Sequence, residues 1–388
     1  MKKIVAFILS ISMLFSVNIY AEENAEQKSQ TVKAKSSVLM EASSGTIIKA
    51  ENENERLSPA SITKIMTMIL IFDAIHSGKV RLTDMATTSA YAKSMGGSQV
   101  FLEEGEQQSV ETLIKCIIIA SGNDASVTMA EHIYGSEEEF VKQMNERAKG
   151  LGMVNTHFED CCGLTDSDNH YTTAKDVAIM SRELITKYPE VFQYSTIWME
   201  PFIHKTAQGE SEFMLSNTNK LLKTNQYVKG LKTGSTSKAK YCVSTVAEKD
   251  GVELIAVIMA APDYKSRFAL AESLINYGFS NCKVYKDETD YKKYIPVSGG
   301  EKEKIKMRYR GFSYVDTKGS DLDKIKREVI MKENIAAPIK KGDVVGKVEY
   351  TLDGKVIGEN FLEAGEAVKK ADYLYTLGKM FRLFLQIA

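Results

Sequence analysis

The apolar positions between residues 58 and 78 repeat with the period of a buried helix. They recur at about every third or fourth residue, at Ile62, Ile65, Met66, Ile69, Phe72 and Ile75. Ser58 suits the N-cap, Pro59 suits the first helical position, where no N–H is lost, and Gly78 supplies a stop. The pattern therefore predicts a buried helix that begins near Pro59.

A predicted hairpin precedes this helix, and a mostly helical stretch follows it. Ser37–Met40 and Thr46–Ala50 have the pattern of two strands, and Gly45 between them is available for a positive φ. From Thr83 to Ala148 the pattern is mostly helical, with Ser121-Gly122-Asn123 as a turn between two helices. This stretch predicts a helical lobe.

Beyond Trp198 the apolar period changes from that of helices to that of strands. Before this point, Thr173 and Asp176 resemble a capping box and open one more helix, which runs through Thr186. Four strand patterns then follow, at Glu200–Lys205, Tyr227–Thr233, Lys240–Glu248 and Val252–Ala260. With the early hairpin they predict an antiparallel sheet flanked by helices, a fold of the α/β (α+β) class, in a domain over residues 36–280.

Residues 281–366 change in character and predict a small β-rich domain. Their charged, alternating segments are separated by glycine turns and lie at Lys304–Tyr309, Val315, Arg327–Met331 and Val344–Leu352. Nothing in this stretch brings catalytic groups together, so we expect a spacer or partner-binding role for it.

The two ends of the chain have patterns typical of export and membrane attachment. Met1-Lys2-Lys3 precedes the apolar run Ile4–Val17, which predicts a secretory signal over residues 1–21, cleaved after Ala21. Ile19 is larger than the residue usual three positions before a cleavage site, which leaves an uncleaved anchor as the alternative. Residues 22–35 are polar and predict a flexible lead-in.

The last stretch, within residues 367–388, has the pattern of an amphipathic helix. Apolar residues follow one side, at Leu374, Leu377, Phe381, Phe384 and Ala388, and polar residues follow another, at Lys379, Arg382 and Gln386. The segment is too short and too charged to span a bilayer. Two alternatives remain: the helix packs on the β domain, or it lies on an anionic membrane surface.

Charge and composition exclude other classes of function. The chain has 388 residues with 50 basic and 51 acidic side chains, so no overall field attracts nucleic acid. Five cysteines, an odd number, argue against a closed disulfide framework, and the adjacent Cys161 and Cys162 do not pair easily with each other. The scattered histidines have no metal-ligand spacing, and a loop-ordering role is expected for His170. No metal and no cofactor are predicted.

A hydroxyl and an amine share one face of the predicted helix start, because Ser61 and Lys64 are three residues apart. Backbone N–H groups lack partners there, and the helix dipole favours an anion. Alone, this pair more often marks a capped, solvated helix start. Two further triplets, Ser121-Gly122-Asn123 and Lys232-Thr233-Gly234, follow in the order typical of penicillin-binding proteins and class A β-lactamases, with Gly122 in place of the usual Asp.

Along most of its length the chain resembles the D-alanyl-D-alanine carboxypeptidases, the low-molecular-mass penicillin-binding proteins. The similarity covers these segments: Ser58–Thr67, Met95–Ser98, Ala120–Ala125, His170–Ala174, Asn219–Leu222 and Gly230–Ser235. It is greatest with the Gram-positive, sporulation-type members. The resemblance implies the fold shared by penicillin-binding and serine β-lactamase domains, with the small β domain beneath the catalytic one.

Each motif then has an expected role in acyl transfer. Ser61 is the expected nucleophile, and Lys64 is the expected base, since burial and a second cation lower the pKa of a lysine. The resemblance places Lys232 across the cleft as that cation. Ser121 and Asn123 are expected to complete the hydrogen-bond network.

The oxyanion needs hydrogen-bond donors, and the backbone of the substrate needs space beside the strand. The N–H groups of Ser61 and Ser235 are the expected oxyanion donors. Gly234, on an edge strand, leaves room for a peptide to lie alongside. Many relatives have His in the position of Ser235.

A carboxypeptidase also binds a terminal carboxylate, for which Lys232 and Thr233 are suitable. Arg267 aligns with an arginine that the family uses near this pocket, and the alternative for it is a solvated surface arginine. The expected partners are therefore peptidoglycan stem peptides that end in D-Ala-D-Ala, and β-lactam antibiotics.

Two other functions compete with this one. A class A β-lactamase adds a glutamate that drives hydrolysis of the acyl-enzyme, and Glu159 lies in roughly the right stretch but lacks a suitably spaced Asn. Asp160–Leu164 instead resembles the carboxypeptidase pattern. A non-catalytic, wall-associated scaffold would not need Ser61 and Lys64. The sequence thus predicts an exported serine-type D-Ala-D-Ala carboxypeptidase on the outer face of the cytoplasmic membrane, where the resemblance places a C-terminal helix.

Overall fold

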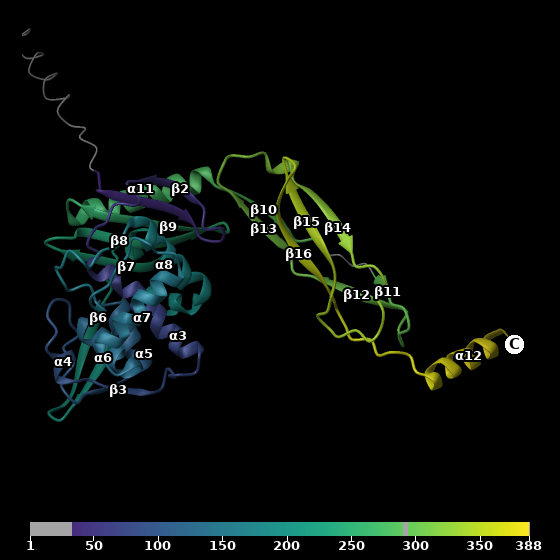
Figure 1. The fold of residues 1–388 in the computed structure, drawn as a ribbon, viewed down its shortest axis with the longest axis horizontal. Coiled ribbons are helices and arrows are strands. Elements are labelled where there is room, and N and C mark those ends of the chain that lie inside the picture. The colour runs from purple at the N-terminus through teal and green to yellow at the C-terminus, as the bar shows by residue number, and fades with distance from the viewer. Residues whose placement is uncertain (1–32, 290–293, 388) are drawn as a thin grey trace, which may run out of the picture.

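The computed structural model describes residues 33–289 and 294–387. The predicted signal segment and residues 22–32 of the lead-in lie outside the described residues. Figure 1 shows a larger body of helices and strands, a smaller body of strands beside it, and the last helix, α12 (Tyr373–Ile387), at the far end of the smaller body. The predicted α/β (α+β) fold with antiparallel sheets and a C-terminal β domain is confirmed.

A five-stranded antiparallel sheet forms the base of the larger body, in the order β2-β1-β9-β8-β7. Its strands are β1 (Ser36–Glu41), β2 (Ile47–Glu51), β7 (Val228–Thr236), β8 (Lys240–Lys249) and β9 (Val252–Ala261). The predicted hairpin β1–β2 is confirmed, and Gly45 in its turn has a φ of 73°. The strand β7, which carries the third motif, is an edge strand of this sheet.

Helices cover both faces of the sheet. On one face, α11 (Tyr264–Asn281) packs through Phe268, Ala271 and Ile275 onto β8 and β9. On the other, α3 (Lys64–His76) and α8 (Ala174–Lys187) share a core with the oppositely directed residues of the same strands. Nearly every residue of α3 is buried, as its apolar pattern predicts.

The start of the buried helix differs from the prediction. Ala60–Thr63 form a 3-10 turn, η1, with Pro59 in the N-cap position, and α3 begins at Lys64. No side chain caps either beginning, so the predicted cap at Ser58 is wrong. The reason is the backbone: Ala60 has a φ of 47°, and a left-handed residue in the first turn does not fit the geometry of a capped helix.

The stretch between residues 83 and 148 forms the predicted helical lobe. Its helices are α4 (Ala90–Lys93), α5 (Val110–Ile118), α6 (Asn123–Tyr134) and α7 (Glu137–Gly150). The Ser121-Gly122-Asn123 turn joins α5 to α6, as predicted. Two short strands within the lobe, β3 (Met85–Thr87) and β4 (Gln107–Ser109), were not predicted, because three residues are too few to show an alternating pattern.

One predicted strand does not join the main sheet. β5 (Met199–Thr206) pairs with β6 (Gly209–Ser216) in a separate hairpin. Its residues alternate between exposed and buried, because Phe202 and His204 face the helical lobe while their neighbours face solvent. Alternation predicts a strand but does not say which sheet it joins. The helical elements on either side of this hairpin are η2 (Pro189–Val191), α9 (Phe192–Ser195) and α10 (Leu221–Thr224).

The smaller body contains a five-stranded sheet in the order β11-β12-β16-β15-β14 and a pair of strands, β10 and β13. The strands are β10 (Lys283–Asp287), β11 (Tyr294–Pro296), β12 (Lys304–Tyr309), β13 (Phe312–Asp316), β14 (Lys326–Met331), β15 (Val344–Leu352) and β16 (Lys355–Ala364), with a short turn η3 (Leu322–Lys324). They enclose a core of their own, which includes Ile305, Val348, Tyr350 and Leu362. Val284 and Val315 pack instead on the core that lies between α11 and the main sheet of the larger body.

The helix α12 presents its apolar side to solvent. Phe381 is 65% exposed and Phe384 is 75% exposed. Tyr375 donates a hydrogen bond to the carbonyl of Glu301, and Lys379 pairs with Glu303, so polar contacts join the helix to the segment before β12. Of the helices within the described ranges, none has the length and apolar character needed to cross a membrane.

Candidate active site

The turn η1 and the first turn of α3 bring the predicted nucleophile and base together. Lys64 Nζ donates to Ser61 Oγ at 3.1 Å, to Asn123 Oδ1 at 2.6 Å and to the carbonyl of Cys162 at 2.8 Å. The Lys64 side chain is 0% exposed. Three acceptors from three segments therefore hold the amine beside the Ser61 hydroxyl.

The surroundings of Lys64 favour its neutral form. Burial lowers the pKa of Lys64, and the nearby carboxylates of Asp160 and Asp124 raise it by less. A lysine can accept a proton from a serine hydroxyl only when its amine is neutral, so this shift suits a base.

The second motif enters the site from the turn between α5 and α6. Ser121 has a φ of 65°, and its Oγ accepts a hydrogen bond from Lys232 Nζ at 2.9 Å. Asn123, in the first turn of α6, bridges Lys64 and the carbonyl of Gly96, to which its Nδ2 donates at 2.7 Å. The turn thus connects the two lysines of the site.

The third motif lies on the edge strand β7, across the cleft from η1. Lys232 is buried, and burial lowers its pKa well below the ordinary lysine value, with a further contribution from the charges of Lys64 and Arg267. Thr233 Oγ1 donates to Thr218 Oγ1 at 2.7 Å. Repulsion by the charge of Lys64 thus adds to the effect of burial on Lys232.

Gly234 lies where the strand approaches the helix start most closely. A Cβ at this position would come within 2.8 Å of the carbonyl oxygen of Pro59 and 3.0 Å of the backbone nitrogen of Ser61. Only glycine fits this approach. Ser235 follows it at the exposed end of β7, and the residues of both predicted oxyanion donors, Ser61 and Ser235, line the cleft.

Arg267 is not a solvated surface arginine, because it is only 4% exposed. It lies in the first turn of α11, and one guanidinium nitrogen donates to the carbonyls of Gly234 and Cys242, at 3.3 Å each. Its Nε is buried without a hydrogen-bond partner. A buried cation with an unused donor beside a cleft is suited to an anionic ligand.

These residues surround a cleft of about 250 Å³. Ser61, Ser121, Thr233, Gly234, Ser235 and Arg267 line it, whereas Lys64, Asn123 and Lys232 lie behind its wall. The lining also includes residues to which the sequence analysis assigned no role: Ser98, Ser216, Asn217, Thr218, Lys220 and Tyr264. Ser98 and Lys220 lie in segments that carry the family resemblance, and Asn217 and Thr218 belong to the polar run that follows β6, whereas nothing in the sequence marked Tyr264. Among the lining residues of the described chain there is no carboxylate, thiol or imidazole, so the cleft is suited to an anion and not to a metal ion.

His170 orders a loop, as predicted. One ring nitrogen lies 2.9 Å from Thr63 Oγ1, and the other accepts the N–H of Glu159 at 3.1 Å. The side chain of Glu159 is exposed and does not line the cleft. The cleft therefore lacks the glutamate that a class A β-lactamase mechanism needs at this position.

Comparison with known proteins places this site in a family. The family model for D-alanyl-D-alanine carboxypeptidases matches residues 22–263, and the model for the C-terminal domain of penicillin-binding protein 5 matches residues 279–370. The D-alanyl-D-alanine carboxypeptidase DacF of Bacillus subtilis is 41% identical over 381 residues, with 96% of each chain covered.

Solved structures agree with these matches. Penicillin-binding protein 5 from Haemophilus influenzae is 33% identical, has a TM-score of 0.65, and is matched over 88% of this chain and 99% of that chain. Penicillin-binding protein D2 from Listeria monocytogenes, solved in an ampicillin-bound form, is 28% identical, with a TM-score of 0.55 over 65% of this chain and 100% of that chain. The chain therefore belongs to the D-alanyl-D-alanine carboxypeptidase family of serine-type hydrolases.

Proposed function

We propose that Ser61 forms an acyl-enzyme with stem peptides that end in D-Ala-D-Ala, and so releases the terminal D-alanine. The observation that carries this proposal is the buried amine of Lys64, held by hydrogen bonds to both Ser61 Oγ and Asn123 Oδ1. A nucleophile beside a base that a third group orients is the arrangement that acyl transfer requires.

The reaction proceeds in two steps. In the first, Ser61 Oγ attacks the carbonyl carbon between the two D-alanines while its proton passes to Lys64 Nζ. The oxyanion that forms accepts hydrogen bonds from the N–H groups of Ser61 and Ser235. The C–N bond then breaks, and the leaving amine receives the proton through Ser121. In the second step, water hydrolyses the ester and restores Ser61.

The enzyme recognises its substrate by the free terminal carboxylate. Lys232, Thr233 and Arg267 supply the donors for it, and support comes from the burial of both cations and from the unpaired Nε of Arg267. A planar guanidinium suits a carboxylate because it offers parallel donors.

β-Lactams acylate the same serine, and the resulting acyl-enzyme is hydrolysed slowly. The ampicillin-bound form of the Listeria relative supports this, as does the absence of a glutamate from the described lining of the cleft. Rapid β-lactam hydrolysis is accordingly not a second function of this site.

The protein acts outside the cytoplasmic membrane. The signal pattern of residues 1–21 directs export, residues 22–35 connect it to the catalytic domain at 36–280, and the β domain at 281–366 separates that domain from the helix at 367–388. The exposed apolar side of α12 supports attachment to the outer face of the membrane, with Lys379 and Arg382 near anionic headgroups. We also propose a role in peptidoglycan maturation during sporulation, which rests on the resemblance of the sequence to sporulation-type members of the family.

One experiment tests the central proposal. The protein is incubated in parallel with fluorescent penicillin and with a peptide that ends in D-Ala-D-Ala, and covalent label and released D-alanine are followed together. Penicillin should label the protein in a one-to-one ratio and block D-alanine release to the same extent. Release of D-alanine that continues in fully labelled protein would contradict a shared serine.

A further inference from the structure

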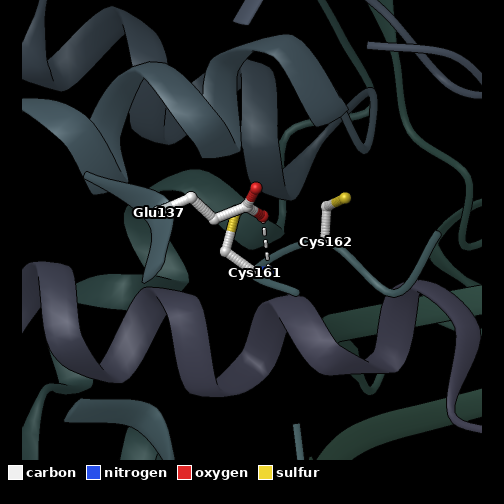
Figure 2. A group of neighbouring side chains, drawn as sticks. All are labelled: Glu137, Cys161 and Cys162. Carbon is white, nitrogen blue, oxygen red and sulfur yellow. Dashed lines mark hydrogen bonds between the residues drawn. The ribbon is translucent and has the colours of Figure 1, made fainter. Parts of the chain in front are cut away.

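A second cluster of reactive side chains lies beside α3, outside the cleft. Cys161 and Cys162 are 0% and 1% exposed, and both are free thiols. The side chain of Glu137, from the start of α7, extends toward both of them, as Figure 2 shows. One carboxylate oxygen and the two sulfur atoms lie within 4.8 Å of one another.

Hydrogen bonds hold the parts of this cluster in place. The N–H of Cys161 donates to Glu137 Oε1 at 3.0 Å, and the hydroxyl of Tyr91 donates to Glu137 Oε2 at 2.7 Å. The N–H of Cys162 donates to Asp160 Oδ1 at 2.8 Å. The backbone of both cysteines and the carboxylate are thus oriented without any ligand, and hydrogen bonds that orient the ligating side chains support metal sites in general.

We propose that Glu137, Cys161 and Cys162 bind a thiophilic divalent ion such as Zn²⁺ or Cd²⁺, with water in the fourth position. Two sulfurs and one carboxylate oxygen are a ligand set that soft thiolate chemistry favours over Mg²⁺ or Ca²⁺. Ligand atoms around a tetrahedral zinc ion lie ~3.4–3.8 Å apart, whereas the three atoms here lie within 4.8 Å of one another, so the side chains would rotate toward one another as the ion enters. Glu137 is partly exposed, which leaves a route of entry from solvent.

Binding of the divalent ion leaves the net charge of the cluster unchanged, because two protons leave as the ion enters. Each thiol loses its proton as the ion enters, so two thiolates, one carboxylate and one divalent cation carry the same net charge as two thiols and one carboxylate. Ion binding therefore releases protons and weakens as the pH falls.

An ion bound at this cluster would stabilise the segment that carries Cys161 and Cys162. The carbonyl of Cys162 accepts a hydrogen bond from Lys64 Nζ, and that of Cys161 accepts one from Thr67 Oγ1. An ion on the two sulfurs would tie this segment to α7 as well as to α3. The ion should therefore raise the thermal midpoint of the protein.

The test uses Cd²⁺ alone as the probe, added to the full chain with reduced thiols and no chelator. One Cd²⁺ per chain should bind with thiolate-to-cadmium absorption in the ultraviolet, proton release and a raised thermal midpoint. Cys161→Ser and Cys162→Ser should each reduce the absorption to that of a single thiolate. Tyr91→Phe, which frees the Glu137 carboxylate, should weaken binding by about tenfold.

Cys282→Ser is the matched control, because Cys282 is a free thiol at the end of α11, far from this cluster in sequence. It should bind Cd²⁺ like the unchanged protein, and penicillin labelling checks that each variant is folded. Three results would overturn the proposal: no thiolate absorption in the unchanged protein, full absorption in the Cys161→Ser/Cys162→Ser protein, or its loss in Cys282→Ser. The absorption measurement does not depend on Ser61, so it fails or succeeds independently of the proposed acyl transfer.

Discussion

Lys64 Nζ lies 3.1 Å from Ser61 Oγ, one turn along the same helix start, with no part of the Lys64 side chain exposed to solvent. This relationship joins two requirements of acyl transfer, because the burial that lowers the pKa of the Lys64 amine also fixes it against the nucleophile. It leads directly to predictions for both residues.

Ser61→Ala should give no covalent penicillin adduct, since the cleft then lacks a hydroxyl in contact with the buried amine of Lys64. Intact-mass spectrometry after incubation with penicillin measures this. Ser58→Ala is the matched control, because Ser58 lies outside the lining of the cleft, and this variant should be labelled normally. An adduct on the Ser61→Ala protein would mean that another residue is the nucleophile.

Lys64→Ala should slow acylation by roughly a hundredfold to ten-thousandfold, the range of general base catalysis. Lys64→Arg should be similarly slow, because a guanidinium keeps its proton. Stopped-flow acylation by a chromogenic β-lactam gives the rates. Near-normal acylation in either variant would exclude Lys64 as the base.

The acylation rate should depend on pH through Lys64. Since burial lowers the pKa of Lys64, its neutral fraction rises as the pH increases through that pKa, and the rate should rise with it and then level off below the ordinary range of lysine. The charge of Lys64 lowers the pKa of Lys232, and repulsion between two charges is mutual, so Lys232→Ala should move the midpoint of this rise to higher pH.

The matched control for that shift is Lys238→Ala. Lys238 is an exposed residue outside the lining of the cleft, its Nζ donates to Asp168 Oδ1 at 2.6 Å, and its removal should leave the midpoint unchanged. A pH profile that is the same with and without Lys232 would show that the two cations are not coupled.

Arg267→Ala should raise KM for a peptide with a free terminal carboxylate by roughly tenfold to a hundredfold, the effect of a lost hydrogen bond to a charged group. The same peptide with an amidated terminus should be a poor substrate for the unchanged protein and should be little affected by the substitution. The ratio of kcat/KM for the two peptides is the measurement, since partial unfolding changes both values equally. Equal cleavage of acid and amide would favour an endopeptidase.

Deletion of residues 371–388 should release the protein from anionic vesicles and leave D-alanine release from soluble peptide intact. Phe381→Ser/Phe384→Ser should reduce binding because both rings are exposed, and Thr376→Ala, on the same helix, should not. Vesicle sedimentation measures binding, and high salt should weaken it by screening Lys379 and Arg382. Equal binding of the truncated and full-length chains would refute attachment through α12.

Much of the fold could be predicted from local patterns in the sequence. The apolar repeat after Ser61 predicts α3 because burial on all sides leaves an unbroken apolar sequence, and the strands of the main sheet carry an equally clear pattern. The family resemblance implied that the three motifs meet, whereas local pattern marked each of them separately, at a predicted helix start, turn or strand. These features need only neighbouring residues to be recognised.

The tertiary structure decided whatever depends on contacts between distant segments. The cap at Ser58 is absent because Ala60 has a left-handed backbone, and β5 pairs with β6 in a separate hairpin in which Phe202 packs toward the helical lobe. The third acceptor of Lys64 is the carbonyl of Cys162, which no sequence pattern marks, since every residue has a carbonyl. Burial of Arg267 and the meeting of Glu137 with the two cysteines likewise come from packing. A sequence specifies side-chain chemistry and local period, whereas distance and desolvation, which set pKa and coordination, arise only when the chain is folded.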